Sequence, residues 1–227
     1  MISCVMPTYN REEYLAESIE SVLMQSEKDF ELIVVDDGST DDTAILMEYY
    51  TKKDKRIKYV RSDVNQGIAK TRNMGIRASK GEYIAVMDSD DLCHPDRLKK
   101  QLKLLKKGDC DVVYSSYLQA DENAKVFAGQ EACPKVTKES IINNNSAPHV
   151  TIMARRQCFE ECPYREEAVV NDDAWLLADW YKKGYRFKRI LEPLMIVRYH
   201  PNSVSVTRDK EVREIGKLIE AELDGTN

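Results

Sequence analysis

Three acidic side chains lie within four positions directly after a short apolar run. The run Tyr83–Met87 carries no charge, which is typical of a strand buried on both faces, and Asp88, Asp90 and Asp91 follow it. Carboxylates this close repel one another unless a cation lies among them, and hard oxygen ligands suit Mg²⁺ or Mn²⁺. A solvated acidic turn before a helix near Pro95 explains the same spacing equally well.

The composition is typical of one soluble globular domain. The 227 residues are 32% charged and 42% hydrophobic, and the net charge of -5 argues against a nucleic-acid partner. No apolar run approaches the roughly 20 residues of a membrane span, and Met1 leads straight into an apolar strand rather than a leader. We therefore expect a cytoplasmic protein. The six cysteines lack the spacing of a disulfide scaffold, so we expect reduced thiols.

The first half of the chain alternates between expected strands and helices. Strands are predicted at Ile2–Met6, Glu31–Val35, Ile57–Val60 and Tyr83–Met87, and helices after Asn10, at Asp41–Lys52, at Ile68–Ser79 and near Pro95. Pro7 is expected to end the first strand. Asn10 is expected to cap the first helix, with Glu13 at the capping-box position. This order predicts an α/β fold in which a mostly parallel sheet has helices on both faces.

Polar clusters follow three of these strands. They are Thr8-Tyr9-Asn10, Asp36-Asp37 and Asp88-Ser89-Asp90. Ligands of open α/β sheets bind outside the carboxyl ends of the strands, so we expect the three clusters to meet at one edge. Their convergence is a stronger indication of a site than any one cluster.

Arg72 occupies an unusual position on its predicted helix. It lies between Ile68 and Ile76 at a spacing of four residues, which places it on the apolar stripe. A buried arginine is costly unless it is paired with an anion. The partner is either an acid at a strand end or a bound phosphate or base, and the spacing slightly favours the ligand.

The second half is less regular. Strands are expected at Asp111–Tyr117, Val126-Phe127, Val150–Met153, Arg186–Ile190 and Met195–Tyr199, and helices at Thr137–Asn143 and from Asn171 to a C-cap at Gly184. Leu176, Leu177, Trp180 and Tyr181 are expected to face the core from that last helix. The amphipathic tail Asp209–Leu223 could pack on the domain, pair with another subunit or lead into a further segment.

With these residues in view, the chain resembles the family 2 glycosyltransferases, which are inverting enzymes of the GT-A fold. Six blocks match in order: Pro7-Thr8-Tyr9-Asn10, Val34–Asp41, Asn65-Gln66-Gly67 with Arg72-Asn73-Met74-Gly75, Met87–Asp91, Asn171-Asp172-Asp173, and Arg198-Tyr199-His200-Pro201 with Ser203 and Ser205. The resemblance implies a Rossmann-like sheet with a smaller mixed region on the acceptor side. It divides the domain into a nucleotide-sugar-binding half (1–117), an acceptor-binding and catalytic-base half (118–207) and a C-terminal helix (208–227).

The resemblance also implies a role for each matching residue in the first half. The nucleotide, a UDP-type donor, would be held by Pro7, Thr8, Tyr9, Asn10, Asp37, Arg72, Asp88 and Ser89. Asp37 would accept the uracil N–H, and Tyr9 would lie against the ring. Asp88 would contact the ribose or the metal.

The metal and the base follow from the same resemblance. Asp90 would ligate a Mn²⁺ or Mg²⁺ ion that bridges the diphosphate, with His200 nearby. The metal would stabilise the leaving group as negative charge builds on it. Asp173 matches the base that takes the proton of the acceptor hydroxyl. An acid placed only to complement the dipole of a helix start is the alternative for Asp173, and a surface histidine is the alternative for His200.

Two departures from the family pattern fall on the acceptor side. Asp172 stands where a glutamate is usual, and Cys162-Pro163-Tyr164 replaces a common glycine pair. A Gln-x-x-Arg-Trp block is absent, which argues against a processive polysaccharide synthase. The expected acceptor is a glycan or a lipid-linked glycan, which allows peripheral association with the inner face of a membrane, and the tail allows an oligomer.

Two other functions compete with sugar transfer. A sugar-1-phosphate nucleotidyltransferase would carry a glycine-rich, basic phosphate loop after the first strand, where this chain has Pro7-Thr8-Tyr9-Asn10. A non-catalytic sugar-nucleotide-binding protein would not need the competent side chains that fill every catalytic position. Both are therefore weaker than the transferase interpretation.

Overall fold

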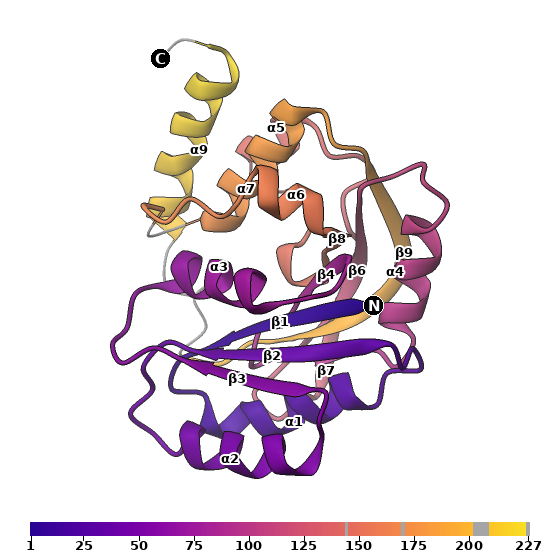
Figure 1. The fold of residues 1–227 in the computed structure, drawn as a ribbon. Coiled ribbons are helices and arrows are strands. Elements are labelled where there is room, and N and C mark those ends of the chain that lie inside the picture. The colour runs from indigo at the N-terminus through magenta and orange to yellow at the C-terminus, as the bar shows by residue number, and fades with distance from the viewer. Residues whose placement is uncertain (144, 169–170, 202–208, 226–227) are drawn as a thin grey trace.

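The computed structural model describes residues 1–143, 145–168, 171–201 and 209–225, and this part of the chain forms one curled sheet with helices on both faces (Figure 1). Nine strands take part, in the order β3-β2-β1-β4-β8-β6-β9-β5, with β7 paired to β6. The pairs β3-β2, β2-β1, β1-β4 and β6-β9 are parallel. The predicted α/β class and mostly parallel sheet are therefore confirmed.

The first half supplies the parallel part of the sheet. Its elements are β1 (Ile2–Thr8), α1 (Glu12–Leu23), β2 (Phe30–Asp36), α2 (Thr43–Lys53), β3 (Ile57–Arg61), α3 (Ile68–Ala78), β4 (Tyr83–Val86), β5 (Leu92–Cys93) and α4 (Arg97–Leu105). Every residue of β1, β2 and β4 is buried, as expected for strands covered on both faces. The two-residue strand β5, which the sequence did not predict, pairs with β9 beyond the acid cluster.

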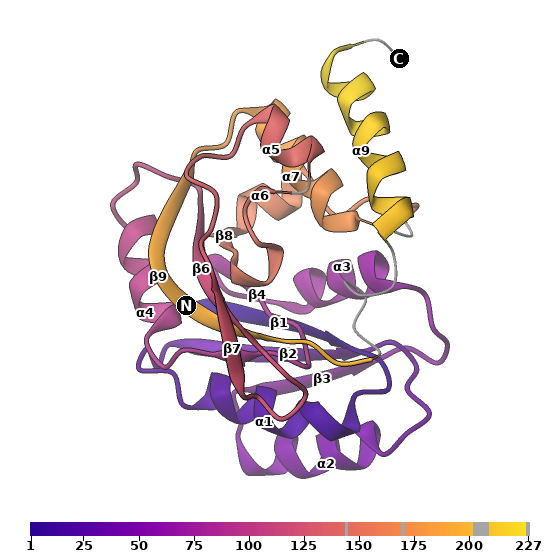
Figure 2. The same ribbon diagram turned by 180° about the vertical axis from the view of Figure 1, so that it is seen from behind.

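The second half supplies the mixed part. Its elements are β6 (Val112–Ala120), β7 (Val126–Gln130), α5 (Lys138–Ile142), the 3₁₀ turn η1 (His149–Thr151), β8 (Met153–Arg155), α6 (Arg156–Glu161), α7 (Asp172–Lys183), β9 (Phe187–Arg198) and α9 (Asp209–Leu223). Figure 2 shows β9 curving along β6, with which it pairs in parallel. β8 is antiparallel to both β4 and β6 and so joins the two parts of the sheet.

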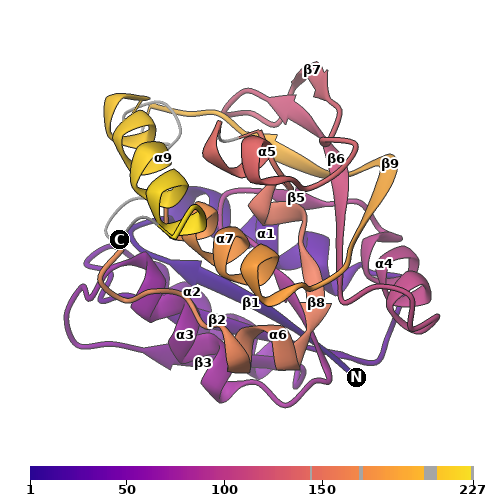
Figure 3. The same ribbon diagram turned by 90° about the horizontal axis from the view of Figure 1, so that it is seen from above.

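Two apolar cores lie on opposite faces of the sheet. Helices α1, α2 and α4 bury Leu15, Ile19, Met47, Leu98 and Leu102 on one face. Helices α3, α6 and α7 bury Ile76, Phe159, Leu176, Leu177 and Trp180 on the other. α9 lies beside α5 and α7 (Figure 3), and its Ile219 belongs to this second core. Of the three alternatives for the tail, the described part packs on its own domain. No described helix is both long and apolar enough to span a membrane.

Two predictions about the link between the first strand and the first helix are wrong. β1 continues through Pro7 to Thr8, because its pairing with β4 covers only Ile2–Val5 and leaves an unpaired side for a residue without N–H. Asn10 does not cap α1, which begins at Glu12 after Arg11 without a side-chain cap. Asn10 instead adopts a left-handed backbone conformation and accepts a hydrogen bond from the backbone N–H of Thr40.

Local irregularities explain the other differences. Residues 150 and 151 form a 3₁₀ turn, and the strand expected there starts only at Met153. The two strands expected near the C-terminus are one strand, β9, whose register with β6 shifts at Pro193. Tyr181 is 41% exposed and does not face the core, and Ile68 at the start of α3 is 39% exposed.

Gly75 allows α3 to lie close against the sheet. A Cβ atom at this position would lie 2.4 Å from Cγ1 of Val5 and 2.9 Å from Cγ2 of Val35, on the two strands beneath the helix. Both distances are shorter than real contacts, and both partners are branched core side chains with little freedom to move. The glycine therefore sets the distance between the sheet and the helix that carries Arg72.

We expect Gly75→Ala to lower the free energy of unfolding by about 1–2 kcal/mol. Overpacking costs about 1–3 kcal/mol, and the better helix propensity of alanine returns only part of it. The matched control is Gly129→Ala in β7, whose added Cβ meets its nearest neighbour at an ordinary 3.8 Å. Denaturant unfolding measures both variants. Equal stabilities for the two would contradict the close packing of α3.

Candidate active site

A cleft of about 790 Å³ opens where the predicted polar clusters meet. Its walls include Pro7, Thr8, Tyr9, Asp37, Arg72, Asp88, Ser89, Asp90 and Asp173. The size is that of a site for a small ligand. Of the predicted nucleotide residues, only Asn10 is absent from the lining. Ser203 and Ser205 of the last sequence block lie outside the described residues.

Asp37 shapes one end of the cleft. Its carboxylate accepts hydrogen bonds from the backbone N–H groups of Gln66 and Gly67, at 2.8 and 2.9 Å. Gly67 has a positive φ of 93°, which a residue with a side chain rarely adopts, and it precedes α3 directly. These bonds fix the loop before α3 to the end of β2. The block Asn65-Gln66-Gly67 therefore anchors the helix that carries Arg72.

The acid cluster after β4 lies in an environment that disfavours ionisation. Burial raises the pKa of Asp91 well above its usual value, and the charges of Asp90 and Asp88 raise it further. Burial also raises the pKa of Asp88, although the Arg72 guanidinium acts against that shift. Asp91 is 3% exposed and accepts a hydrogen bond from the backbone N–H of Arg198. Asp91 therefore holds β9 against the cluster, and it lines the cleft together with Asp88 and Asp90.

The two residues of the predicted metal site, Asp90 and His200, are in contact, but only Asp90 lines the cleft, and His200 is buried behind it. The Nε2 of His200 donates to Oδ2 of Asp90 at 3.0 Å, and Nε of Arg11 donates to the same oxygen at 3.4 Å. The ring of Tyr14 stacks on His200, with 4.7 Å between the centroids. Arg11 was not predicted, because nothing in its sequence context marks it as facing an acid.

Asp90 and His200 fit a divalent cation whose coordination shell is completed by the oxygens of a diphosphate. No group of three or more His, Cys, Asp or Glu side chains in the described part of the chain forms a ready metal site. Mg²⁺ is usually held by one or two carboxylates together with substrate phosphates, so a complete protein cage is not required. One carboxylate oxygen of Asp90, already facing an imidazole, supplies the expected donor chemistry.

Arg72 bridges the two walls of the cleft. Its Nη1 contacts Oδ2 of Asp172 at 2.5 Å, and its Nη2 contacts Oδ1 of Asp88 at 3.1 Å. The side chain is buried, and its Nε has no hydrogen-bond partner among the described residues. Arg72 is therefore paired with acids, the alternative that the sequence slightly disfavoured, and its Nε–H is left without an acceptor among the described residues. Asp172, which only interrupted the family pattern in the sequence, is the buried partner.

Asp173 stands at the first turn of α7 on the same wall. Removal from water, and then the charge of Asp172, raise the pKa of Asp173 to about 6, while the charge of Arg72 lowers it. A carboxyl group with a pKa near 6 is ionised at neutral pH and is a better proton acceptor than an ordinary aspartate. The two adjacent aspartates thus differ in their contacts: Asp172 pairs with Arg72, and Asp173 faces the cleft.

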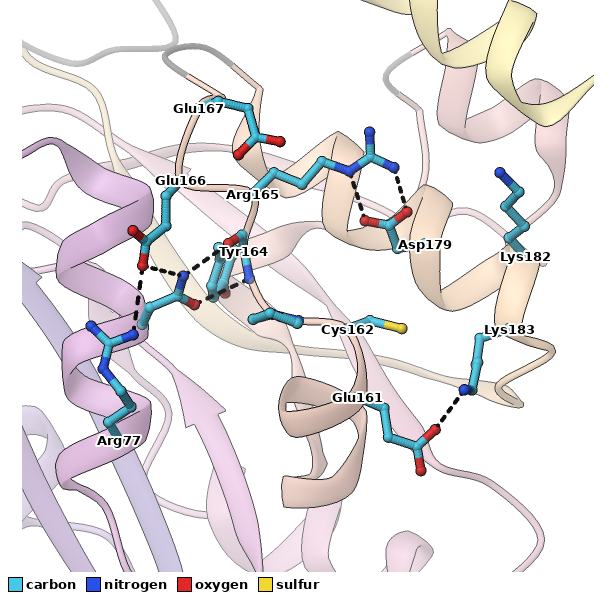
Figure 4. Close-up of a pocket in the computed structure, with 12 residues that line it drawn as sticks. Arg77, Glu161, Cys162, Tyr164, Arg165, Glu166, Glu167, Asp179, Lys182 and Lys183 are labelled. Carbon is cyan, nitrogen blue, oxygen red and sulfur yellow. Dashed lines mark hydrogen bonds and ion pairs between the residues drawn. The ribbon is translucent and has the colours of Figure 1, made fainter. Parts of the chain in front are cut away.

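A second, shallower pocket lies behind α3 and α7 (Figure 4). Six of its charged side chains pair with one another: Arg165 with Asp179, Arg77 with Glu166, and Lys183 with Glu161. Tyr164 is held there by two hydrogen bonds between its backbone and the side chain of Asn73. These pairs stabilise the packing of the surrounding helices. The described cysteines are all free thiols, as expected.

Comparison with known proteins decides the family. The family model for glycosyl transferase family 2 matches residues 3–206. The chain belongs to this family. The glycosyltransferase TuaG of Bacillus subtilis, whose name places it in teichuronic acid biosynthesis, is 30% identical over 94% of this chain and 85% of its own length. An uncharacterized glycosyltransferase of Rickettsia conorii is 44% identical over 77% of this chain, which spans 29% of that relative's length.

Solved structures of glycosyltransferases share the fold. Residues 1–349 of Staphylococcus aureus TarS, in complex with UDP-GlcNAc, superpose with a TM-score of 0.79 at 23% identity, over 98% of this chain and 69% of that one. The mannosyltransferase PcManGT of Pyrobaculum calidifontis, in complex with GDP-Man and Mn²⁺, gives a TM-score of 0.74 at 16% identity, over 100% of this chain and 64% of that one. The predicted GT-A architecture of this family 2 member is thus confirmed.

The bridge predicts a stability effect. We expect Arg72→Met to lower the free energy of unfolding by about 3–5 kcal/mol at pH 7.5, because it leaves Asp172 buried without a counter-charge. The double variant Arg72→Met/Asp172→Leu should recover most of that loss, since it removes the charge as well as its partner. Denaturant unfolding of the wild type, the single variant and the double variant measures the loss of stability and its recovery. A single variant as stable as the wild type would show that the bridge contributes nothing.

Proposed function

We propose that this chain transfers a sugar from a nucleotide-diphosphate donor, with UDP-sugars as the first choice, to a hydroxyl group of a glycan or lipid-linked acceptor. The proposed reaction is a single displacement with inversion, assisted by Mn²⁺ or Mg²⁺. One observation carries it: the carboxylate of Asp173, with its raised pKa, shares a cleft with Asp88 and Asp90 on another wall. A proton acceptor and a phosphate-binding region are thereby combined in one site.

Unsatisfied polar atoms support the binding of a nucleotide in this cleft. Oγ1 of Thr8 and Nε of Arg72 are both buried there without a hydrogen-bond partner among the described residues. Such atoms are costly unless a ligand or water completes them. Tyr9, 41% exposed at the rim, offers a ring on which a base can stack. The TarS complexes with UDP-GlcNAc and UDP favour uridine as the base.

Asp90 and His200 are the residues that would hold the divalent cation. When bound, the cation supplies neutralisation of the negative charge that develops on the departing diphosphate. The PcManGT complex with Mn²⁺ supports this assignment by analogy of fold. Arg72, fixed between Asp88 and Asp172, contributes a further positive charge beside the same region.

The residues of this chain then perform one proton transfer. The acceptor oxygen forms a bond to the anomeric carbon, and its proton passes to the carboxylate of Asp173. The bond from the anomeric carbon to the diphosphate breaks, and its electron pair leaves with the diphosphate. Inverting hydrolases need a second carboxyl group to protonate the leaving group, whereas a diphosphate leaves without protonation. One base is therefore sufficient.

The metal assignment predicts the behaviour of Asp90→Ala. We expect this variant to lose Mn²⁺-stimulated release of UDP from UDP-sugars and to bind UDP more weakly only when metal is present. Calorimetry with UDP, with and without Mn²⁺, separates the two conditions. Full activity of the wild type in excess chelator would contradict the assignment.

The base assignment predicts a loss of transfer in Asp173→Asn. The rate should fall by roughly 10²–10⁴-fold, the usual contribution of a positioned base, while the affinity for UDP stays near normal. Because the base acts in its ionised form, the wild-type kcat/KM should fall as the pH drops below about 6. Asp172→Asn is the comparison and should lose much less activity. An inactive Asp172→Asn beside an active Asp173→Asn would move the base by one residue.

Asp173→Asn is also expected to be more stable than the wild type at neutral pH. Burial and the charge of Asp172 raise the folded-state pKa of Asp173 to about 6, above that of an aspartate in the unfolded chain, so its contribution to folding is present at low pH and is lost as the pH rises through about 6. Asp173→Asn should therefore be more stable than the wild type at pH 7.5, on the order of 1–2 kcal/mol after the lost helix-dipole contribution. The difference should disappear near pH 4. Equal pH profiles would show that Asp173 titrates normally.

A further inference from the structure

His149 is a buried residue of the cleft that the proposed reaction does not use. It is 8% exposed, lies in the turn η1, and lines the cleft. Its Nε2 lies 2.6 Å from the hydroxyl of Tyr164, which is itself 2% exposed. Its Nδ1 has no hydrogen-bond partner among the described residues. Burial lowers the pKa of His149 well below its usual value, with the charges of Arg72 and Arg97 acting in the same direction.

The Tyr164 contact determines which nitrogen of the ring carries the proton. The hydroxyl of Tyr164 has no other partner among the described residues. Its O–H therefore has an acceptor only if it donates to Nε2 of His149. A neutral imidazole that accepts at Nε2 carries its proton on Nδ1. The guanidinium of Arg72 over the Tyr164 ring, 5.5 Å from its centroid, strengthens the phenol as a donor. The result is a fixed Nδ1–H donor on the wall of the cleft.

A second unsatisfied group lies on the same loop. Oγ of Ser146 is buried and has no partner among the described residues, and Ser146 also lines the cleft. A hydroxyl and an imidazole N–H, three residues apart, are groups that bind the hydroxyl or carbonyl oxygens of a sugar. The buried Oγ of Ser146 is costly without a partner, and Nδ1 of His149 on the same loop has none among the described residues, so a ligand is the natural partner for both.

The position of η1 assigns these groups to the donor sugar. η1 packs against β4 and β6, and β4 leads directly into Asp88 and Asp90, where the diphosphate is proposed to lie. The sugar of the donor is joined to that diphosphate, so it must lie next to the end of β4. His149, 8% exposed, lines the buried side of this cleft.

We propose that His149 is a specificity-determining residue that donates a hydrogen bond from Nδ1 to an oxygen of the donor sugar, with Tyr164 as the positioning residue that fixes its tautomer and Ser146 as a second contact. This inference rests on the proposed function, because it takes the cleft to be the site of a sugar nucleotide. The ligand class is the pyranose of a nucleotide sugar, recognised through a hydroxyl or an acetamido carbonyl.

The tautomer gives a direct test on the wild-type protein. The chain has only three histidines, so long-range ¹H–¹⁵N spectra of the labelled protein contain three rings, and His149→Gln identifies the signals of His149. We expect His149 to be neutral with its proton on Nδ1, and to respond to UDP-N-acetylglucosamine, UDP-glucose or UDP-galactose but not to UDP. A proton on Nε2, or the same response to UDP alone, would overturn the proposal. Tyr164→Phe should give a mixture of tautomers, which a merely structural tyrosine would not change.

Binding measurements separate this inference from the proposed function. His149→Ala should weaken the binding of the best UDP-sugar by about 5–10-fold, the scale of one neutral hydrogen bond, and leave the affinity for UDP unchanged. His94→Gln, outside the cleft, is the matched control and should change neither. Equal losses for UDP and UDP-sugar would overturn the role of His149 alone. A wild type that binds neither UDP nor any UDP-sugar would overturn the donor assignment, and this inference with it.

Discussion

The buried guanidinium of Arg72 is the contact on which the rest of the site depends. It projects from α3, and its two partners come from elements far apart in the chain, Asp88 after β4 and Asp172 at the start of α7. One cation thus joins the loop after β4 to the first turn of α7. Its position follows from Gly75, which lets α3 approach the sheet, and from Asp37, which fixes the loop before the helix.

The same charge sets the balance of protons in the cleft. The carboxyl groups of Asp88, Asp90, Asp172 and Asp173 are among those that line its walls. Burial and the charges of neighbouring carboxylates raise the pKa values of Asp88 and Asp173, and the charge of Arg72 acts against both shifts. The proposed sugar-nucleotide donor would bring anionic phosphates and a cation to these groups. Pairing in the free protein holds Arg72 between Asp88 and Asp172, and its buried Nε has no hydrogen-bond partner among the described residues.

The sequence predicted the features that depend on periodicity and on strand ends. Buried strands such as Tyr83–Val86 show as uncharged runs, and parallel strands place their following loops at one edge, so the meeting of Thr8, Asp37 and Asp88 could be foreseen. Contacts between distant elements could not. Nothing local marks Arg11 as a partner of Asp90, or Tyr164 as a partner of His149, because in each pair the two residues lie on different elements that only the tertiary packing brings together. The prediction that Pro7 ends the first strand was wrong because β4, the partner on one side of β1, pairs only with Ile2–Val5.

The most direct test of the bridge is the pKa of the Asp173 carboxyl group, followed by ¹³C NMR in the wild type and in Arg72→Met. The wild type should titrate near 6, since burial and Asp172 raise the pKa against the charge of Arg72. Removal of Arg72 should move that pKa higher, because the repulsion from Asp172 and Asp88 is then uncompensated. An Asp173 that titrates near 4 in the wild type, or at the same pH in both proteins, would contradict the claim that Arg72 sets the charge of the base.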